Sequence, residues 1–290
     1  MVCLSDCLRV GRIFLRGVGQ VFLQRSAWAG ICFLGAVAWQ SGPLALACGL
    51  GTWVGTQWGL RYGTREECED GLHGYNGALA GIGVLVVLPP GPLAWGLVVV
   101  LAWLVTWLAQ VWRRHGPLSP YTAPFILATW LLMIIASAAG WPAPVAGTSA
   151  VMGDGLMAWA QGTLRGVGQV MFLDDLGAGA LCILGLSLSR PGAALCAVLA
   201  SALTLLAALA AGFPGDAASL GLYGFNAVLT AEALRQALPG RWGALCLGVL
   251  ASLGLMRGFQ VLELPSLTAP FVLATLLVRQ LSRTLSFFKA

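Results

Sequence analysis

The chain has 290 residues, of which 58% are hydrophobic and only 9% are charged, and its formal net charge at pH 7 is +5. Soluble domains carry about 25% charged residues, so this chain has too few to cover a water-facing surface. The composition therefore predicts an integral membrane protein, and so small a net charge gives no indication of nucleic-acid binding.

Ten apolar spans follow one another along the chain, five in each half. They are predicted at 26–41, 43–60, 76–89, 92–112 and 121–140, and at 172–188, 191–212, 226–238, 242–260 and 266–282. The longer ones reach the about 20 residues that a membrane-spanning helix needs, and they are apolar all round, which favours helices over a barrel. The third span of each half is short and follows a glycine-rich stretch, so we expect a re-entrant half-helix or a broken helix there.

Three motifs occur once in each half, in the same order. They are RGVGQV at 16–21 and 165–170, GLHGYNGALAG at 71–81 with GLYGFNAVLTA at 221–231, and TAPF-x-LAT at 122–129 and 268–275. The offsets of 149, 150 and 146 residues are nearly constant, which indicates an internal duplication. We therefore predict a first repeat at 1–148 and a second at 149–290, with a seam rich in Pro, Gly, Ala and Ser near 140–155.

The arginines predict that the second repeat is inverted relative to the first. With the N-terminus inside, the inside segments hold thirteen basic residues, Arg9, Arg12, Arg16, Arg61, Arg65, Arg113, Arg114, Arg190, Arg235, Arg241, Arg279, Arg283 and Lys289. The outside segments hold Arg165 and Arg257, and Arg25 is ambiguous. Basic loops of one half correspond to nearly bare loops of the other. This agrees with the preference of Lys and Arg for the cytoplasmic side, with inverted repeats, and with two cytoplasmic termini.

The motifs supply the candidate polar groups of a pathway near the repeat interface. Each half offers one glutamine amide (Gln20, Gln169), one asparagine amide (Asn76, Asn226) and one threonine beside a proline (Thr122, Thr268). Each has a structural alternative: a polar cap at a helix end, a brace for a neighbouring broken segment, or a hydroxyl bonded back to its own helix.

Several function classes lack their residues. The candidate carboxylates are Asp174, Asp175, Glu232 and Glu263, all near predicted span ends, so no acidic ring or arginine ladder crosses the membrane. The histidines His73 and His115 do not form a pair, and Tyr223 stands at the position of His73 in the second half. The eight cysteines form no CxxC motif and are expected to pack between helices. We predict no enzyme, metal or cofactor, and a small neutral solute that forms hydrogen bonds.

The sequence resembles the urea transporter family over essentially its whole length. The resemblance rests on GQV near the first span of each half, on the (Y/F)N(G/A)xL stretch, and on (L/Y)TAPF in the fifth span. It implies two inverted five-helix halves, each with a re-entrant half-helix, around a central pore. It also implies a homotrimer with one pore per protomer and passive permeation of urea. The compact length and short termini imply a bacterial type in the cell inner membrane.

The resemblance also implies the roles of the substrate-binding residues. Gln20 and Gln169 would accept hydrogen bonds from urea near two end sites, and Asn76 and Asn226 would support or join the oxygen wall. The aromatic slots would be formed by Tyr75, and by Phe225 with Phe172. Thr122 and Thr268 would line the central constriction, with Val21, Val170, Leu79 and Leu229 as its apolar walls. Such a slot suits a flat solute with four N–H donors, because the oxygens replace the water that the solute loses.

The first half departs from the family pattern at two positions. Leu23 stands where the family usually has phenylalanine, and Tyr75 also replaces a usual phenylalanine. The alternative function that remains is a facilitator for another small neutral solute, such as a short amide, ammonia or water. The missing histidine pair argues against an ammonia channel, and the missing NPA repeats argue against an aquaporin.

Overall fold

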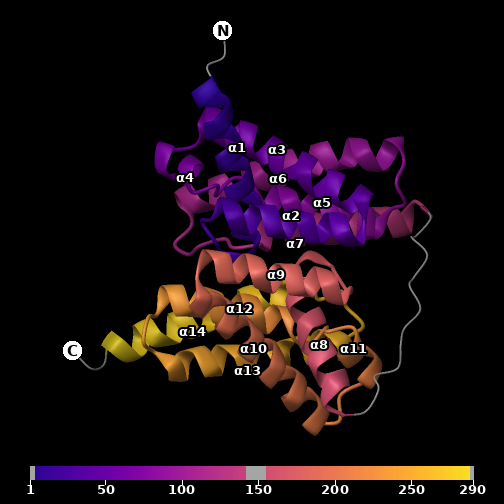
Figure 1. Ribbon diagram of the computed structural model, residues 1–290, viewed down its shortest axis with the longest axis vertical. Helices are drawn as coiled ribbons and strands as arrows, with labels where there is room; N and C mark the ends of the chain where they lie inside the picture. Colours follow the sequence, from indigo (N-terminus) through magenta and orange to yellow (C-terminus); the bar gives the residue numbers. More distant parts are fainter. Residues whose placement is uncertain (1–3, 142–154, 288–290) are drawn as a thin grey trace. The chain divides into compact units, whose positions relative to one another are not determined.

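The computed structural model describes residues 4–141 and 155–287, which form helices joined by turns and contain no β-strand (Figure 1). The chain divides into two compact units, Met1–Gly147 with Leu184–Ser189, and Thr148–Ile183 with Arg190–Ala290. The predicted boundary between residues 148 and 149 lies outside the described residues, and so does most of the predicted seam.

The two halves repeat the same order of elements. The first has α1 (Leu4–Gly19), η1 (Gln20–Phe22), α2 (Ala27–Gln40), α3 (Gly42–Tyr62), α4 (Arg65–Glu69), α5 (Tyr75–Val87), α6 (Pro92–His115) and α7 (Ala123–Ala138). The second has α8 (Leu156–Gly168), η2 (Gln169–Met171), α9 (Leu176–Ser189), α10 (Pro191–Ala210), α11 (Gly215–Ser219), α12 (Phe225–Ala237), α13 (Trp242–Val261) and α14 (Ala269–Phe287). Each apolar span predicted from the sequence coincides with one of these helices to within a few residues.

Two helices of more than ten residues, α1 and α8, were not expected from the sequence. Arg9, Arg12 and Arg16 make the first twenty residues look like a charged tail, which hides the apolar face of α1. Ile13 and Val18 on that face are fully or almost fully buried. A helix with a charged face and an apolar face is stabilised by packing rather than by continuous hydrophobicity.

The short helices α5 and α12 lie at the centre of their halves. Eleven of the thirteen residues of α5 are buried, and ten of the thirteen of α12. A helix that is apolar all round, as most of α5 is, must be covered on every side by protein or by lipid. In the first half the backbones of α3 and α5 touch, because a side chain on Gly51 or Gly77 would collide with the other residue's carbonyl group. Small residues thus let the neighbouring helix enclose α5.

The hydropathy of the described helices agrees with a membrane protein. Three helices, α6, α10 and α13, are long and apolar enough to cross a bilayer, and the count rises to five if each of two bent helix pairs is one span. The bent pairs are α1–η1 with α2, at 72°, and α8–η2 with α9, at 73°. The apolar helices α5 and α7 are shorter.

Candidate functional site

The two glutamines of the RGVGQV motifs hold equivalent turns in their halves. Gln20 Nε2 donates to the Asp70 carbonyl at 2.8 Å, and Gln169 Nε2 donates to the Leu220 carbonyl at 2.9 Å. Each acceptor immediately precedes a glycine with a positive φ of 75° or 76°. The glutamine therefore fixes the turn that leads into α5 or α12.

The arginines of the same motifs hold the preceding carbonyl group. Arg16 Nη1 donates to the Glu69 carbonyl at 2.6 Å, and Arg165 Nη1 donates to the Ser219 carbonyl at 3.0 Å. These carbonyl groups lie at the C-termini of α4 and α11, where a helix leaves its last acceptors unpaired. This role of the arginines was not predicted from the sequence, although the repetition of arginine in both motifs pointed to a shared structural role.

The first glycine of each RGVGQV motif is required for close backbone approach. A Cβ on Gly17 would lie 3.1 Å from the Gly74 Cα, and one on Gly166 would lie 3.1 Å from the Gly224 Cα. Larger residues would push α1 away from the start of α5, and α8 away from the start of α12. Each motif therefore combines a glycine that allows close backbone contact with two side chains, an arginine and a glutamine, that donate hydrogen bonds.

The orientation of each glutamine amide follows from its partner. A carbonyl oxygen only accepts hydrogen bonds, so the amide nitrogen must face Asp70 or Leu220 and the amide oxygen must face away. Within the described part of the chain, neither glutamine oxygen has a hydrogen-bond partner, and each keeps accessible surface. Each half thus presents one pre-oriented acceptor.

The two asparagines brace the first turn of the helix that follows them in space. Asn76 Nδ2 donates to the Tyr121 carbonyl at 3.2 Å, and Asn76 Oδ1 accepts from the Phe125 amide at 3.4 Å. Asn226 makes the equivalent contacts, to the Leu267 carbonyl at 3.3 Å and from the Phe271 amide at 3.0 Å. Both ends of each amide bind backbone groups at or beside the TAPF segment. These contacts are those expected of a brace for a neighbouring segment.

The residue held by each asparagine has an unusual backbone conformation. Tyr121 and Leu267 have φ values of 46° and 45°, in the left-handed region that favours glycine. Non-glycine residues in such regions cost about 1–3 kcal/mol and persist where the surroundings hold them. The asparagine supplies part of that restraint. The Tyr75 hydroxyl supplies more in the first half, because it donates to the Tyr121 carbonyl at 2.7 Å.

A second pair of left-handed residues follows the glutamines. Leu23 has a φ of 59° and Phe172 a φ of 62°, and both are half-buried. They end the 3₁₀ turns η1 and η2, where their amides donate to the carbonyls of Gln20 and Gln169. Leu23 and Phe172 therefore occupy the same structural position in the two halves, as their alignment in sequence predicted.

The other predicted site residues are almost completely buried. Thr122 and Thr268 expose 3% and 2% of their surface, and Tyr75 and Phe225 expose 7% each. The four residues predicted as apolar walls are more buried still, with at most 1% exposed: Val21, Val170, Leu79 and Leu229. The structure thus gathers Gln20, Tyr75, Asn76 and Thr122 around the ends of α5 and α7, and their counterparts around α12 and α14.

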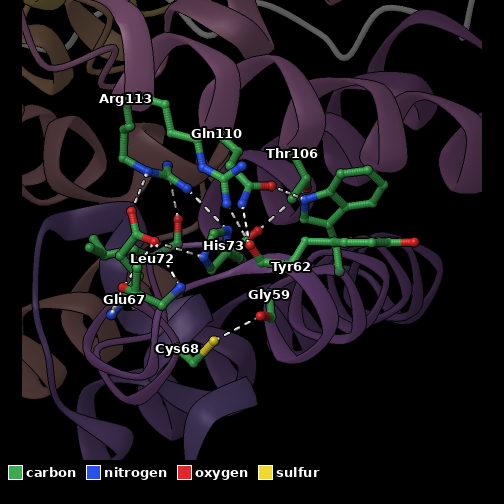
Figure 2. Close-up of polar contacts among 12 residues, drawn as sticks. Gly59, Tyr62, Glu67, Cys68, Leu72, His73, Thr106, Gln110 and Arg113 are labelled. Carbon is green, nitrogen blue, oxygen red and sulfur yellow. Dashed lines mark hydrogen bonds and ion pairs between the residues drawn. The ribbon is translucent and has the colours of Figure 1, made fainter.

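One polar cluster belongs to the first half alone (Figure 2). Arg113 Nη2 lies 3.0 Å from His73 Nδ1, and Arg113 Nε donates to Glu67 Oε1 at 3.2 Å. A guanidinium group only donates, so His73 Nδ1 must accept and the neutral ring carries its hydrogen on Nε2. The Nε2 atom lies 3.7 Å from Glu67 Oε2, beyond hydrogen-bond distance, and has no hydrogen-bond partner among the described residues. We call these three residues the His73 cluster.

The His73 cluster sits against the start of α5. The His73 ring fits against α3 because Gly59 has no side chain, since a Cβ there would lie 2.6 Å from the ring. His73 lies between α4 and α5, outside the candidate spans. Burial, followed by the charge of Arg113, lowers the pKa of His73 to about 4. In the second half, Tyr223 takes this position and its hydroxyl donates to the Pro214 carbonyl at 3.3 Å.

Three of the four candidate carboxylates lie at the surface. Asp174, Asp175 and Glu263 are exposed, whereas Glu232 exposes only 3% of its surface. Glu232 forms an ion pair with Arg235 on the next turn of α12. Within the described residues, the one buried carboxylate is thus neutralised by a neighbour on its own helix.

Comparison with known proteins identifies the family. A family model described as urea transporter matches residues 12–283. The chain belongs to the urea transporter family. It is 31% identical to proteins named urea transporter 1 from Ovis aries and Capra hircus, over 91% of this chain and 74% of theirs. The protein of the same name from Rattus norvegicus is 29% identical over the same shares.

A planar amide solute offers N–H donors, and desolvating them is favourable only where acceptors replace water. A glutamine oxygen whose nitrogen is already bonded is such an acceptor, and it is held in place before the solute arrives. Pre-orientation of this kind lowers the entropic cost of binding.

Proposed function

We propose that the protein conducts urea passively and in a channel-like manner, down the urea gradient. The observation that carries this proposal is the glutamine oxygen left free in each half, in a chain of the urea transporter family. Because Gln20 and Gln169 are equivalent in the duplicated halves, they would serve one end site each.

The aromatic and apolar residues would form the slot around these acceptors. Tyr75 and Phe225 are the first residues of α5 and α12, three or more residues after the turns that the glutamines hold. Phe172 would complete the slot of the second half, and Leu23 would leave that of the first half looser. Thr122 and Thr268 would line the constriction, backed by Val21, Val170, Leu79 and Leu229.

The proposed architecture is two inverted repeats with α5 and α12 as re-entrant half-helices around a central pore. The repeated order of elements supports the duplication, and the uneven distribution of arginines supports the inversion. We further propose a homotrimer with one pore per protomer, in a bacterial inner membrane, with both termini in the cytoplasm.

Purified protein in liposomes is expected to conduct urea without an ion gradient, and much faster than glycerol. The physical reason is that a flat slot admits a planar amide and rejects a bulkier, non-planar triol. Stopped-flow light scattering measures both rates against empty liposomes. Equal rates for urea and glycerol, or a strict requirement for sodium or protons, would rule out the proposed function. Faster passage of short amides, ammonia or water than of urea would favour the alternative solute class.

Thr122→Val combined with Thr268→Val is expected to slow urea flux several-fold while the protein still assembles. Valine keeps the shape of threonine and removes the hydroxyl group that would accompany urea through the constriction. Thr204→Val is the control, because Thr204 is also buried, donates to the Ala200 carbonyl of its own helix at 2.7 Å, and lies outside the proposed constriction. Unchanged flux in the double variant would remove both threonines from the pathway.

A further inference from the structure

A long apolar groove runs along the surface of the second half, outside the proposed pathway residues. Its volume is about 520 Å³, and it lies between α10 and α13 and over the C-terminal end of α12. Its lining is dominated by aliphatic side chains, including Leu195, Leu199, Leu203, Leu238, Leu245 and Val249. The three leucines of α10 expose between 49% and 61% of their surface. In a membrane protein such a groove faces either lipid or another protein.

One end of this groove is basic. Arg235 and Arg241 line it, and Arg190 comes two residues before Gly192, another lining residue. Arg235 is neutralised by its ion pair with Glu232. The guanidinium groups of Arg190 and Arg241 are exposed and have no hydrogen bond or ion pair within residues 4–141 and 155–287. The groove is therefore lined by one positive charge that the described residues leave uncompensated, Arg241, and a second, Arg190, lies two residues along the chain from its lining.

An aromatic residue marks the same end. Trp242 lines the groove directly after Arg241 and exposes 66% of its surface. Tryptophan and arginine side chains in membrane proteins concentrate at the boundary between hydrocarbon and water. The groove thus matches the two parts of a lipid: a long apolar part that suits an acyl chain, and a charged end that suits a headgroup.

The first half lacks the three arginines at its equivalent positions. At offsets of 149 or 150 residues, Ser41 replaces Arg190, Leu85 replaces Arg235 and Gly91 replaces Arg241. Trp95 stands where the second half has Leu245, so the first half has a larger side chain at that position. The basic end of the groove therefore belongs to one repeat only. The packing of the duplicated fold does not require arginines at these positions.

We propose that this groove binds one anionic phospholipid, with an acyl chain along the leucines of α10 and the phosphate group at Arg190 and Arg241. Arginine binds phosphate oxygens through two parallel hydrogen bonds and a full charge. Anionic lipids of the cytoplasmic leaflet attract basic residues at its surface. A second copy of the chain fits the groove less well, because it would bury two uncompensated guanidinium groups at high desolvation cost.

The first experiment measures lipid binding directly. Native mass spectrometry of the purified protein, with phosphatidylglycerol or phosphatidylcholine added, is expected to show one tighter phosphatidylglycerol site per chain. Arg190→Gln with Arg241→Gln is expected to remove this preference, by roughly five-fold in affinity for each arginine. Arg65→Gln is the matched control, since Arg65 is exposed on α4 and has no hydrogen bond or ion pair with the described residues. It is expected to leave the preference unchanged.

Leu245→Trp tests the apolar part independently of charge. This change introduces the residue of the first half, and it is expected to weaken both lipids by filling the groove. Cys246 offers a third readout, because it is exposed and lines the groove, whereas Cys7 is exposed on α1. Phosphatidylglycerol is expected to slow maleimide labelling of Cys246 but not of Cys7.

Three results would overturn the proposal. They are equal binding of the two lipids by the unaltered protein, an undiminished preference in the double arginine variant, and equal labelling of Cys246 with and without phosphatidylglycerol. A shift of oligomer mass in Leu245→Trp with unchanged lipid binding would assign the groove to contact between copies instead. None of these measurements uses urea, so the outcome is independent of the proposed conduction.

Discussion

Asn226→Leu is expected to lower urea flux at least about tenfold and to reduce the melting temperature of the purified protein. Leucine has a similar volume but leaves the Leu267 carbonyl and the Phe271 amide without the partner that Asn226 provides. Each buried group that loses its partner costs about 1–3 kcal/mol. A loss of about 1.4 kcal/mol in holding the left-handed Leu267 lowers the ratio of the competent to the incompetent state tenfold, and two lost partners together exceed that loss. Asn76→Leu is expected to act in the same way on Tyr121 and Phe125.

The matched control is Thr230→Val, one turn further along α12. Thr230 is fully buried, and its hydroxyl donates only to the carbonyl of Asn226 within the same helix, at 2.7 Å. The first half has Ala80 at this position, so the fold does not need the hydroxyl group. Flux in liposomes and thermal unfolding are measured for all three variants. If Asn226→Leu behaves like Thr230→Val in both assays, the brace does not hold the pathway.

Acidification is expected to destabilise the first half through His73. The pKa of His73 falls to about 4 in the folded protein because of burial and the nearby Arg113, against about 6.5 for an unperturbed histidine. Between these values the unfolded chain binds more protons than the folded one, so stability is fully present above pH 6.5 and is lost as the pH falls toward 4. The shift corresponds to about 3 kcal/mol. Protonation would also place a hydrogen on Nδ1, facing Arg113.

The charged groups around His73 do not reverse this expectation. On α4, hydrogen bonds from Thr64 and the charge of Arg113 outweigh the effect of burial and hold the pKa of Glu67 below its usual value. On α6, Arg114 adds to the positive field of Arg113. The Tyr75 hydroxyl of α5 does not titrate in acid. The net effect of lowering the pH is therefore the loss of the Arg113–His73 contact.

His73→Gln separates titration from structure. Glutamine can accept from Arg113 and donate toward Glu67, but it has no proton to gain near neutral pH. We expect urea flux and melting temperature to fall between pH 6.5 and 4 in the unaltered protein, and to stay nearly level in His73→Gln. His115→Gln is the control, since the exposed His115 is the other histidine. An identical pH profile in all three proteins would exclude His73 as the titrating group.

The fold was predictable where hydrophobicity is continuous. The spans at 92–112 and 242–260 reappear as α6 and α13 because long apolar runs have few alternatives in a membrane. Helix α1 was missed because its stability comes from one buried face, which three arginines mask in the sequence. The direction in which helices pack depends on contacts between distant residues, and local patterns do not contain that information.

The sequence predicted the positions of the proposed site residues but not the contacts that their side chains make. Repetition pointed to Gln20, Asn76 and Thr122, together with their counterparts in the second half. It did not separate acceptor from brace, because that depends on which backbone group lies opposite each amide. The structure shows both ends of Asn76 bound to the TAPF segment and only one end of Gln20 bound. The hydrogen bond from Arg16 to the Glu69 carbonyl was not predicted, because a basic residue near a span end was taken only as a sign of which side of the membrane it faces.

The asparagine brace also bears on how the protein is made. Every hydrogen bond of Asn76 joins residues of the first half, and every backbone hydrogen bond of Asn226 joins residues of the second half. A chain leaving the ribosome can therefore close the first brace once Phe125 has emerged, before the second half exists. The second brace needs Phe271, close to the end of synthesis. A chain that stops before Leu267 leaves the Asn226 amide without both of its backbone partners.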